Sequence, residues 1–207
     1  TSLSTNSYNG VRLEGTASIN TLGALTISGT SGSGHHGIWL TGTGSINTVG
    51  DITINGQNTS TNTGLYMDTA YSIKSTTGNI SLTGSGASGI YSYANILAGN
   101  STTPTSGGTI TVNATASGTS NGNYGLDAST SYLISYGALS VTGTAANAHG
   151  VYLHGTGAKF SSPTGITING TGTWGLSMYN NALIQSTAGN ISITSNGSSG
   201  GLYMETT

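Results

Sequence analysis

Aromatic side chains and carboxylates recur together at two positions of a short repeated pattern. The pattern is a glycine followed by an alternating segment, as in Gly64-Leu65-Tyr66-Met67. Its third position, and the position two residues later, hold half of all aromatic residues and five of the eight charged residues. The candidate ligand- or partner-binding residues at these two positions are Trp39, Tyr66, Asp68, Tyr91, Tyr93, Tyr152, His154, Tyr179 and Tyr203.

Three kinds of chemistry fit aromatic rings beside carboxylates. Sugar rings stack on Tyr and Trp, and carboxylates accept hydrogen bonds from sugar hydroxyls. Tyr and Trp are also favoured in protein–protein interfaces. In a third interpretation, the rings form ladders that stabilise neighbouring strands. The sequence leaves these three interpretations open.

The elements that position these residues form a repeat. The glycine recurs eight times, at Gly10, Gly37, Gly64, Gly89, Gly125, Gly150, Gly175 and Gly201. A second, alternating pattern such as Leu25-Thr26-Ile27-Ser28 lies between the copies, at 25–28, 52–55, 80–83, 110–113, 139–142, 166–169 and 191–194. A weaker third pattern stands at 18–20, 45–47, 72–74, 133–135 and 183–185.

This repeat predicts an all-β solenoid. Period-2 alternation buries one side of each strand and exposes the other, and no segment has a helical period. Three short strands in about 27–28 residues are too few for a propeller blade, which has four strands in about 40 residues. We therefore expect a right-handed parallel β-helix of about 7–8 coils, because right-handed crossovers dominate. Residues 1–207 are expected to form one segment, an excerpt of or a subunit in a longer array.

The composition excludes several classes of function. Only 4% of the residues are charged and the net charge is −2, whereas about 25% is usual. Without a basic stripe, nucleic acid is not an expected partner. No apolar run reaches the roughly 18 residues of a membrane span, and the absence of Cys removes disulfides and thiolate metal sites. We expect no cofactor and no metal.

One segment carries a family resemblance. Gly-Asn-Ile-Ser-Leu-Thr-Gly at 78–84, followed by Gly-Ile-Tyr at 89–91, resembles the repeats of filamentous-haemagglutinin-like proteins. These are large bacterial adhesins exported by two-partner secretion or as autotransporters. The resemblance implies a right-handed β-helix, secretion to the cell surface or extracellular matrix, and a role in adhesion or biofilm.

The alternating second pattern predicts a different, hydroxyl-rich face. Its outward positions form one column of Thr26, Thr53, Ser81, Thr111, Ser140, Thr167 and Ser192, and a second of Ser28, Asn55, Thr83, Asn113, Thr142, Asn169 and Thr194. The two columns resemble the Thr-x-Thr faces of β-helical ice-binding proteins, although Ser and Asn interrupt the Thr. Ladders of Asn and Thr are also ordinary on solvent-facing strands.

Catalysis is the least favoured interpretation. Glycosidases need a close pair of carboxylates, whereas Asp68 and Asp127 lie two coils apart, roughly 10 Å at the usual strand spacing. His36 and His149 share a column but lie four coils apart, too far for one metal ion.

The sequence therefore predicts a structural or adhesive repeat segment of a large secreted bacterial cell-surface or extracellular-filament protein, without enzyme activity. Its expected partners are itself, by end-to-end or lateral stacking, neighbouring repeats, and surface glycans or a host or neighbouring cell surface. The alternatives are an ice-binding protein and a glycan-binding or polysaccharide-processing β-helix.

Overall fold

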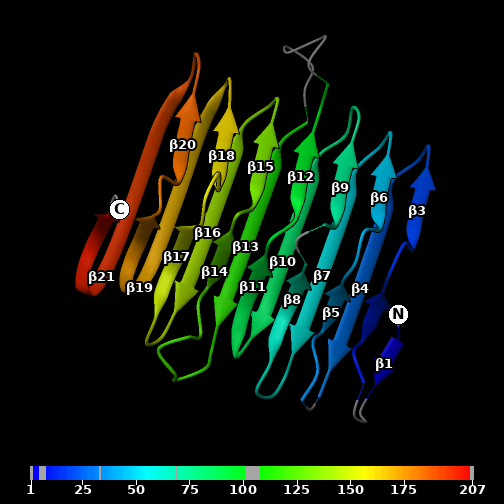
Figure 1. The fold of residues 1–207 in the computed structure, drawn as a ribbon, viewed down its shortest axis with the longest axis horizontal. Coiled ribbons are helices and arrows are strands. Elements are labelled where there is room, and N and C mark those ends of the chain that lie inside the picture. Colours follow the sequence, from blue (N-terminus) through cyan, green and yellow to red (C-terminus); the bar gives the residue numbers. More distant parts are fainter. Residues whose placement is uncertain (1, 5–7, 33, 69, 101–107, 206–207) are drawn as a thin grey trace.

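The fold is an all-β parallel β-solenoid of about seven turns of about 27 residues (Figure 1). It was obtained as a computed structural model, which describes residues 2–4, 8–32, 34–68, 70–100 and 108–205. The predicted coil architecture is thus confirmed, while its right-handed winding stays a prediction. Among the described residues, no helix has the length and hydropathy needed to cross a membrane.

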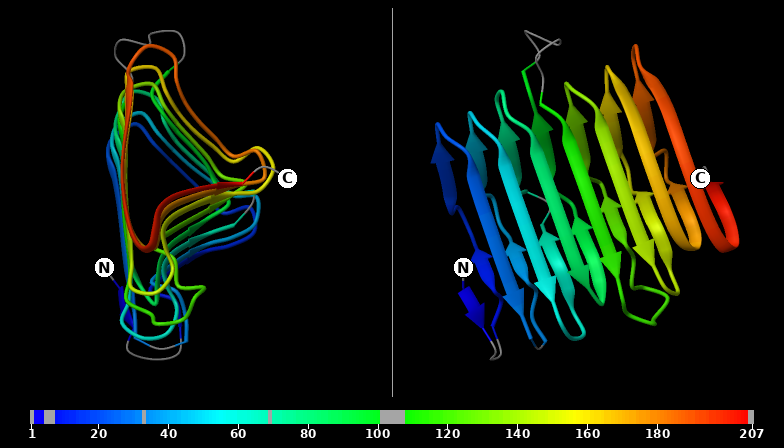
Figure 2. Two further views of the ribbon diagram at one scale, coloured as in Figure 1. Left: turned by 90° about the vertical axis from the view of Figure 1, so that its left-hand side faces the viewer. Right: turned by 180° about the vertical axis from the view of Figure 1, so that it is seen from behind.

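Three strands per coil stack into three faces, which give the solenoid a triangular outline (Figure 2). The first face contains β1 (Ser2–Ser4), β4 (Leu25–Ser31), β7 (Ile52–Asn58), β10 (Ile80–Gly86), β13 (Ile110–Ala116) and β16 (Leu139–Ala145). The second contains β2 (Val11–Leu13), β5 (Ile38–Leu40), β8 (Thr63–Met67), β11 (Ser88–Ser92), β14 (Leu126–Ser129) and β17 (His149–His154). The third contains β3 (Ser18–Thr21), β6 (Ser45–Thr48), β9 (Ser72–Ser75), β12 (Asn95–Ala98), β15 (Tyr132–Ser135), β18 (Lys159–Ser162) and β20 (Leu183–Ser186).

In the last two coils, one long strand serves both the first and the second face. These strands are β19 (Gly165–Tyr179) and β21 (Asn190–Glu205). Because β19 pairs with both β16 and β17, the first and second faces form one 14-stranded sheet, and the third face is a separate 7-stranded sheet. Every pairing between described strands is parallel, so equivalent residues of successive coils form columns along the axis. The partners at one first-face position are Leu25, Ile52, Ile80, Ile110, Leu139, Ile166 and Ile191.

The third face contains two strands that the sequence pattern missed, β12 and β18. In β18 only Phe160 is a large apolar residue, so no alternation is visible. In β12 the adjacent Ile96 and Leu97 are both apolar, which hides the alternation. The register nevertheless places Ile96 and Phe160 in the same column, one on each side of Leu133.

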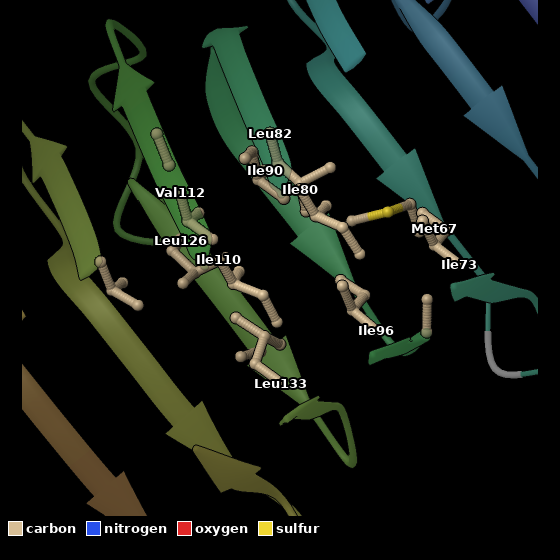
Figure 3. Packing of buried hydrophobic residues seen from close by; sticks show 14 of the residues in the cluster. Met67, Ile73, Ile80, Leu82, Ile90, Ile96, Ile110, Val112, Leu126 and Leu133 are labelled. Atoms are coloured by element: carbon tan, nitrogen blue, oxygen red, sulfur yellow. The ribbon is translucent and has the colours of Figure 1, made fainter. Parts of the chain in front are cut away.

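Columns of aliphatic side chains fill the interior (Figure 3). At the centre of the stack, Ile80, Leu82 and Ile90 are at most 1% exposed. Each buried side chain of this size contributes about 1.5–3 kcal/mol, and the coils above and below complete its burial. Tyr71 is also fully buried, and its hydroxyl donates to the carbonyl oxygen of Ala17 at 3.1 Å. The sequence pattern gave no sign of this core tyrosine.

The repeated glycine marks the corner where the first and second faces approach each other most closely. A Cβ on Gly64 would lie 2.3 Å from the backbone nitrogen of Ser85, and one on Gly56 would lie 2.3 Å from the carbonyl oxygen of Gly64. None of the seven repeated glycines before the last coil has a positive φ. Glycine is therefore required here by the close contact of two backbones, not by a left-handed conformation.

The last coil leaves its interior uncovered. Ile191, Ile193, Leu202 and Met204 are 44%, 39%, 49% and 65% exposed, respectively. Each of these residues stands in the same column as a residue of β19, and β21 covers those β19 residues.

Candidate binding faces

The second face carries the predicted aromatic residues, and the strand register confirms their two columns. Trp39 pairs with Tyr66, Tyr66 with Tyr91, and Tyr152 with Ser177. The column two residues further on includes Ser129 paired with His154. All nine candidate binding residues are partly exposed. We call the outward surface of the second face the aromatic face.

A third column lies on this face, and of it the sequence showed only that His36 and His149 share a column. It consists of the residues directly before the repeated glycine, and four of them carry rings, namely His36, Tyr124, His149 and Trp174. If the alternation were strict, the outward position before Tyr152 would be Gly150 and not His149. In the structure, however, Gly150 and Val151 are both buried, so the alternation shifts by one residue at the glycine corner. The signal in the sequence that could have revealed this column is an aromatic or His residue directly before the repeated glycine.

The first group of rings surrounds Tyr66. Its ring stacks on that of Tyr91, with centroids 5.3 Å apart and planes at 2°, and His36 and Trp39 contact it from the preceding coil. The Tyr91 hydroxyl lies 2.8 Å from that of Tyr93. At the outer end of this group, the Arg12 guanidinium lies 4.6 Å from the centroid of Trp39.

The second group surrounds Tyr152. Its ring contacts His149 at 4.8 Å, His154 at 4.1 Å and Tyr179 at 5.4 Å between centroids. Tyr179 also contacts Tyr203 at 5.2 Å. Burial raises the pKa of Tyr152 to about 12, so its hydroxyl is protonated at neutral pH. The eight candidate residues that carry rings are thus divided between two groups, and no ring contact among the described residues joins them.

Asp127 lies between the two groups, and the structure corrects the exposure predicted for it. Its position in the column was expected to expose the side chain, yet Asp127 is only 2% exposed, because its column neighbours Tyr91 and Tyr152 are large. Oδ1 of Asp127 lies 2.8 Å from Nε2 of His154. Burial raises the pKa of this carboxyl, and the hydrogen bond from His154 partly opposes that rise.

Ser177 is the second residue that was expected outside and is covered. It is fully buried, and its hydroxyl lies 2.6 Å from Nδ1 of His149. This pair is separate from the Asp127–His154 pair, and a covered hydroxyl offers no route for a substrate. Burial lowers the pKa of His149 and holds that of His36 at about 4, so both rings are neutral at pH 7.

The ring stacking limits what this face can bind. Sugars stack on the flat face of an aromatic ring, but the facing sides of Tyr66 and Tyr91 are occupied by each other. Asp68 accepts a hydrogen bond from the Thr41 hydroxyl at 2.9 Å, and Glu205 accepts one from Tyr203 at 3.1 Å. These contacts favour the interpretation that the ladder stabilises neighbouring strands.

No cluster of three His, Cys, Asp or Glu side chains lies within reach of a common metal ion in the described ranges. Asp68 and Asp127 lie on β8 and β14, with β11 between these strands.

The first face carries the predicted hydroxyl and amide columns, and the register adds a third column beside them. We call this surface the polar face. The third column consists of Thr30, Gln57, Ser85, Thr115, Thr144, Thr171 and Asn196. Every outward position of the face from β4 to β21 is thus Ser, Thr, Asn or Gln.

Comparison of the chain with protein-family models, with curated proteins and with solved structures finds no match.

Proposed function

We propose that this chain is a structural and adhesive repeat segment of a large secreted bacterial cell-surface or extracellular-filament protein, and that it catalyses no reaction. The observation that carries the proposal is the exposed interior of the last coil, where the apolar columns continue into Ile191, Ile193, Leu202 and Met204. Coils of this kind are stable in arrays because each one covers its neighbours. The partner we propose for this end is another coil, from a neighbouring repeat or a second copy.

The sides of the solenoid support the adhesive part of the proposal. The aromatic face presents partly exposed Tyr and Trp, residues that are favoured in contacts with other surfaces. The resemblance to filamentous-haemagglutinin-like repeats supports a place on the cell surface or in a biofilm matrix. The covered positions of Ser177 and Asp127 support the absence of catalysis.

The test is to display the segment on a non-adherent bacterium through an unrelated outer-membrane anchor, and to measure autoaggregation and attachment to surfaces. We expect both to rise above those of cells with the anchor alone. An Ile193→Lys variant, which places a charge on the exposed end, should lose the gain in autoaggregation. Val49→Lys, on an exposed turn of the second coil, is the matched control and should keep it. Cells that behave like anchor-only cells would contradict the proposal.

Ice binding is the second candidate, and the third polar column favours it. A flat, uncharged array three columns wide presents regularly spaced hydroxyl and amide groups to the solvent. The test is thermal hysteresis of the purified chain, compared with a Thr111→Tyr variant in the middle of the polar face. Hysteresis that this variant abolishes would support ice binding, and no hysteresis at high protein concentration would reject it.

A further inference from the structure

One corner between the first and second faces carries an unusually long connection. It joins β13 to β14 through residues 117–125, whereas Ala87 alone separates β10 from β11. Figure 2 shows this loop, in green, projecting from the solenoid. The loop is held in place by its own hydrogen bonds. Ser120 N–H donates to Oδ1 of Asn123 at 2.9 Å, and Asn123 N–H donates to the carbonyl oxygen of Ser120 at 3.0 Å.

The loop is also tied to the coils on both sides. Ser117 donates to the carbonyl oxygen of Gly86 on one side. On the other side, Nδ2 of Asn147 donates to the carbonyl oxygen of Thr119 at 3.2 Å. A loop held in this way is ordered before a ligand arrives, which reduces the entropic cost of binding.

Beside this loop lies a cavity of about 380 Å³ that opens to the solvent. Its walls come from three successive coils and include Thr119, Asn121, Asn147, His149, Thr173 and Trp174. Its volume is in the range of small-ligand pockets, about 300–1,000 Å³. None of these residues belongs to the two aromatic columns that the sequence analysis selected.

Trp174 supplies the aromatic wall of the cavity. The column neighbour of Trp174 in the last coil is Gly200, and a Cβ there would lie 2.0 Å from a carbon of the indole six-membered ring. The missing side chain at Gly200 is what lets the indole lie over the next coil. Tyr203 holds the indole from the side in an edge-to-face contact, with centroids 5.1 Å apart.

The polar groups of the cavity are uncharged, and some of their side chains make no hydrogen bond to protein. Thr119 and Asn121 are exposed. Within the described residues, the side chains of Thr119, Asn121 and Thr173 make no hydrogen bond to protein. Burial and the neighbouring His154 lower the pKa of His149, which keeps its ring neutral at pH 7. The cavity thus combines an indole with amide and hydroxyl groups and offers no charge to an ionic ligand.

We propose that this corner cavity is a binding site for neutral saccharide units, with Trp174 as the stacking platform and Asn121, Asn147 and Thr119 as hydrogen-bonding partners for hydroxyls. The proposal deepens the adhesive function, because it names what the segment would adhere to. It does not depend on end-to-end assembly, which involves other residues. A free oligosaccharide and a cell-surface polysaccharide share this chemistry.

The test uses a glycan array of neutral and acidic oligosaccharides and polysaccharides, followed by titration of any bound glycan. We expect binding to neutral glycans, and the length of the bound glycans shows whether free or polymeric sugar is the source. Trp174→Ala should weaken the affinity about tenfold, the loss expected for one stacking contact. Asn121→Ala, on the exposed loop, should weaken it without affecting folding, which circular dichroism verifies.

The two tryptophans of the chain give a matched pair of reporters. In Trp39→Phe, only Trp174 fluoresces, and saccharide should change its emission. In Trp174→Phe, only Trp39 fluoresces, and saccharide should leave its emission unchanged. The proposal is overturned by silence of the array at millimolar glycan, by binding to acidic glycans alone, or by an affinity that Trp174→Ala and Asn121→Ala leave unchanged. A lack of saccharide binding would leave autoaggregation and filament formation unaffected. The two proposals can therefore be rejected independently of each other.

Discussion

Asp127 and His154 form a hydrogen-bonded pair at 2.8 Å on the second face. They lie on the adjacent strands β14 and β17. The Asp127 side chain is 3% exposed and that of His154 is 21% exposed. Because a buried carboxylate is costly without a partner, this pair is the point where removal of a single polar side chain has the largest expected effect.

Asp127→Ala should therefore lower the free energy of unfolding by about 2 kcal/mol, because it leaves His154 without its acceptor and opens a gap between Tyr91 and Tyr152. Asp127→Asn keeps the shape and an acceptor while removing the buried charge, so it should change stability by less than about 1 kcal/mol. Urea denaturation at pH 7 measures both. Glu14→Ala, at an exposed position, is the control. Equal losses for the Ala and Asn variants would contradict the account of the pair.

Acidification should destabilise the solenoid through His36. Its pKa is about 4 in the folded protein, against 6.5 for the ordinary side chain, mainly because of burial. As the pH falls through 6.5, the unfolded chain binds a proton that the folded chain does not bind, so stability falls. For this partly exposed ring, we expect a loss of about 1 kcal/mol between pH 7 and pH 5 after solvent screening.

The comparison that isolates this effect is between two adjacent histidines. His36→Gln should make the unfolding midpoint less dependent on pH over this interval. His35→Gln should keep most of the wild-type slope, because burial lowers the pKa of His36 more than the neighbouring His35 does. Thermal unfolding followed by circular dichroism measures the slopes. If both variants retain the wild-type slope, burial of His36 is not a source of the pH dependence.

The glycine corner predicts a strong contrast between two alanine substitutions. In Gly64→Ala, the new Cβ would lie 2.3 Å from the backbone of Ser85, so the first and second faces must separate. We expect a loss of about 2–3 kcal/mol. A Cβ at Gly23 would meet nothing within 4 Å, and Gly23→Ala should change stability by less than about 0.5 kcal/mol. Similar unfolding midpoints for the two variants would show that the corner is not tightly packed.

The stacked rings of Tyr66 and Tyr91 predict a measurable coupling energy. A double-mutant cycle with alanine at both positions should give an interaction of about 0.5–1.5 kcal/mol. Tyr66 and Tyr179 belong to different ring groups, and their cycle should be additive within about 0.3–0.5 kcal/mol. A Tyr66–Tyr91 coupling no larger than that of the control pair would remove the stabilising role of the ladder.

The coils, the strand register and the two aromatic columns could be predicted from the sequence, because they follow directly from the alternation and the recurring glycine. The third aromatic column could not be predicted from strict alternation, because the alternation shifts by one residue at Gly150. His149 and Trp174 were therefore not assigned to the aromatic face.

Burial on the outward side could not be predicted from alternation. Alternation says that Asp127 and Ser177 point away from the core, but not how large the side chains of adjacent coils are. Both residues lie next to Tyr152 in the column and are covered. The corner cavity depends in the same way on a long loop and on the missing side chain at Gly200, neither of which follows from the repeat.

Electron microscopy of the purified chain over a range of concentrations tests the central claim, that the segment is structural and assembles through its coil ends. We predict short rods at low concentration and filaments at high concentration. Fibre diffraction of these filaments should show a repeat of about 4.7–4.8 Å along the axis, the spacing of stacked strands. Ile193→Lys should remain as isolated rods while Val49→Lys forms filaments. Isolated particles of the wild-type chain at every concentration would contradict assembly through the coil ends.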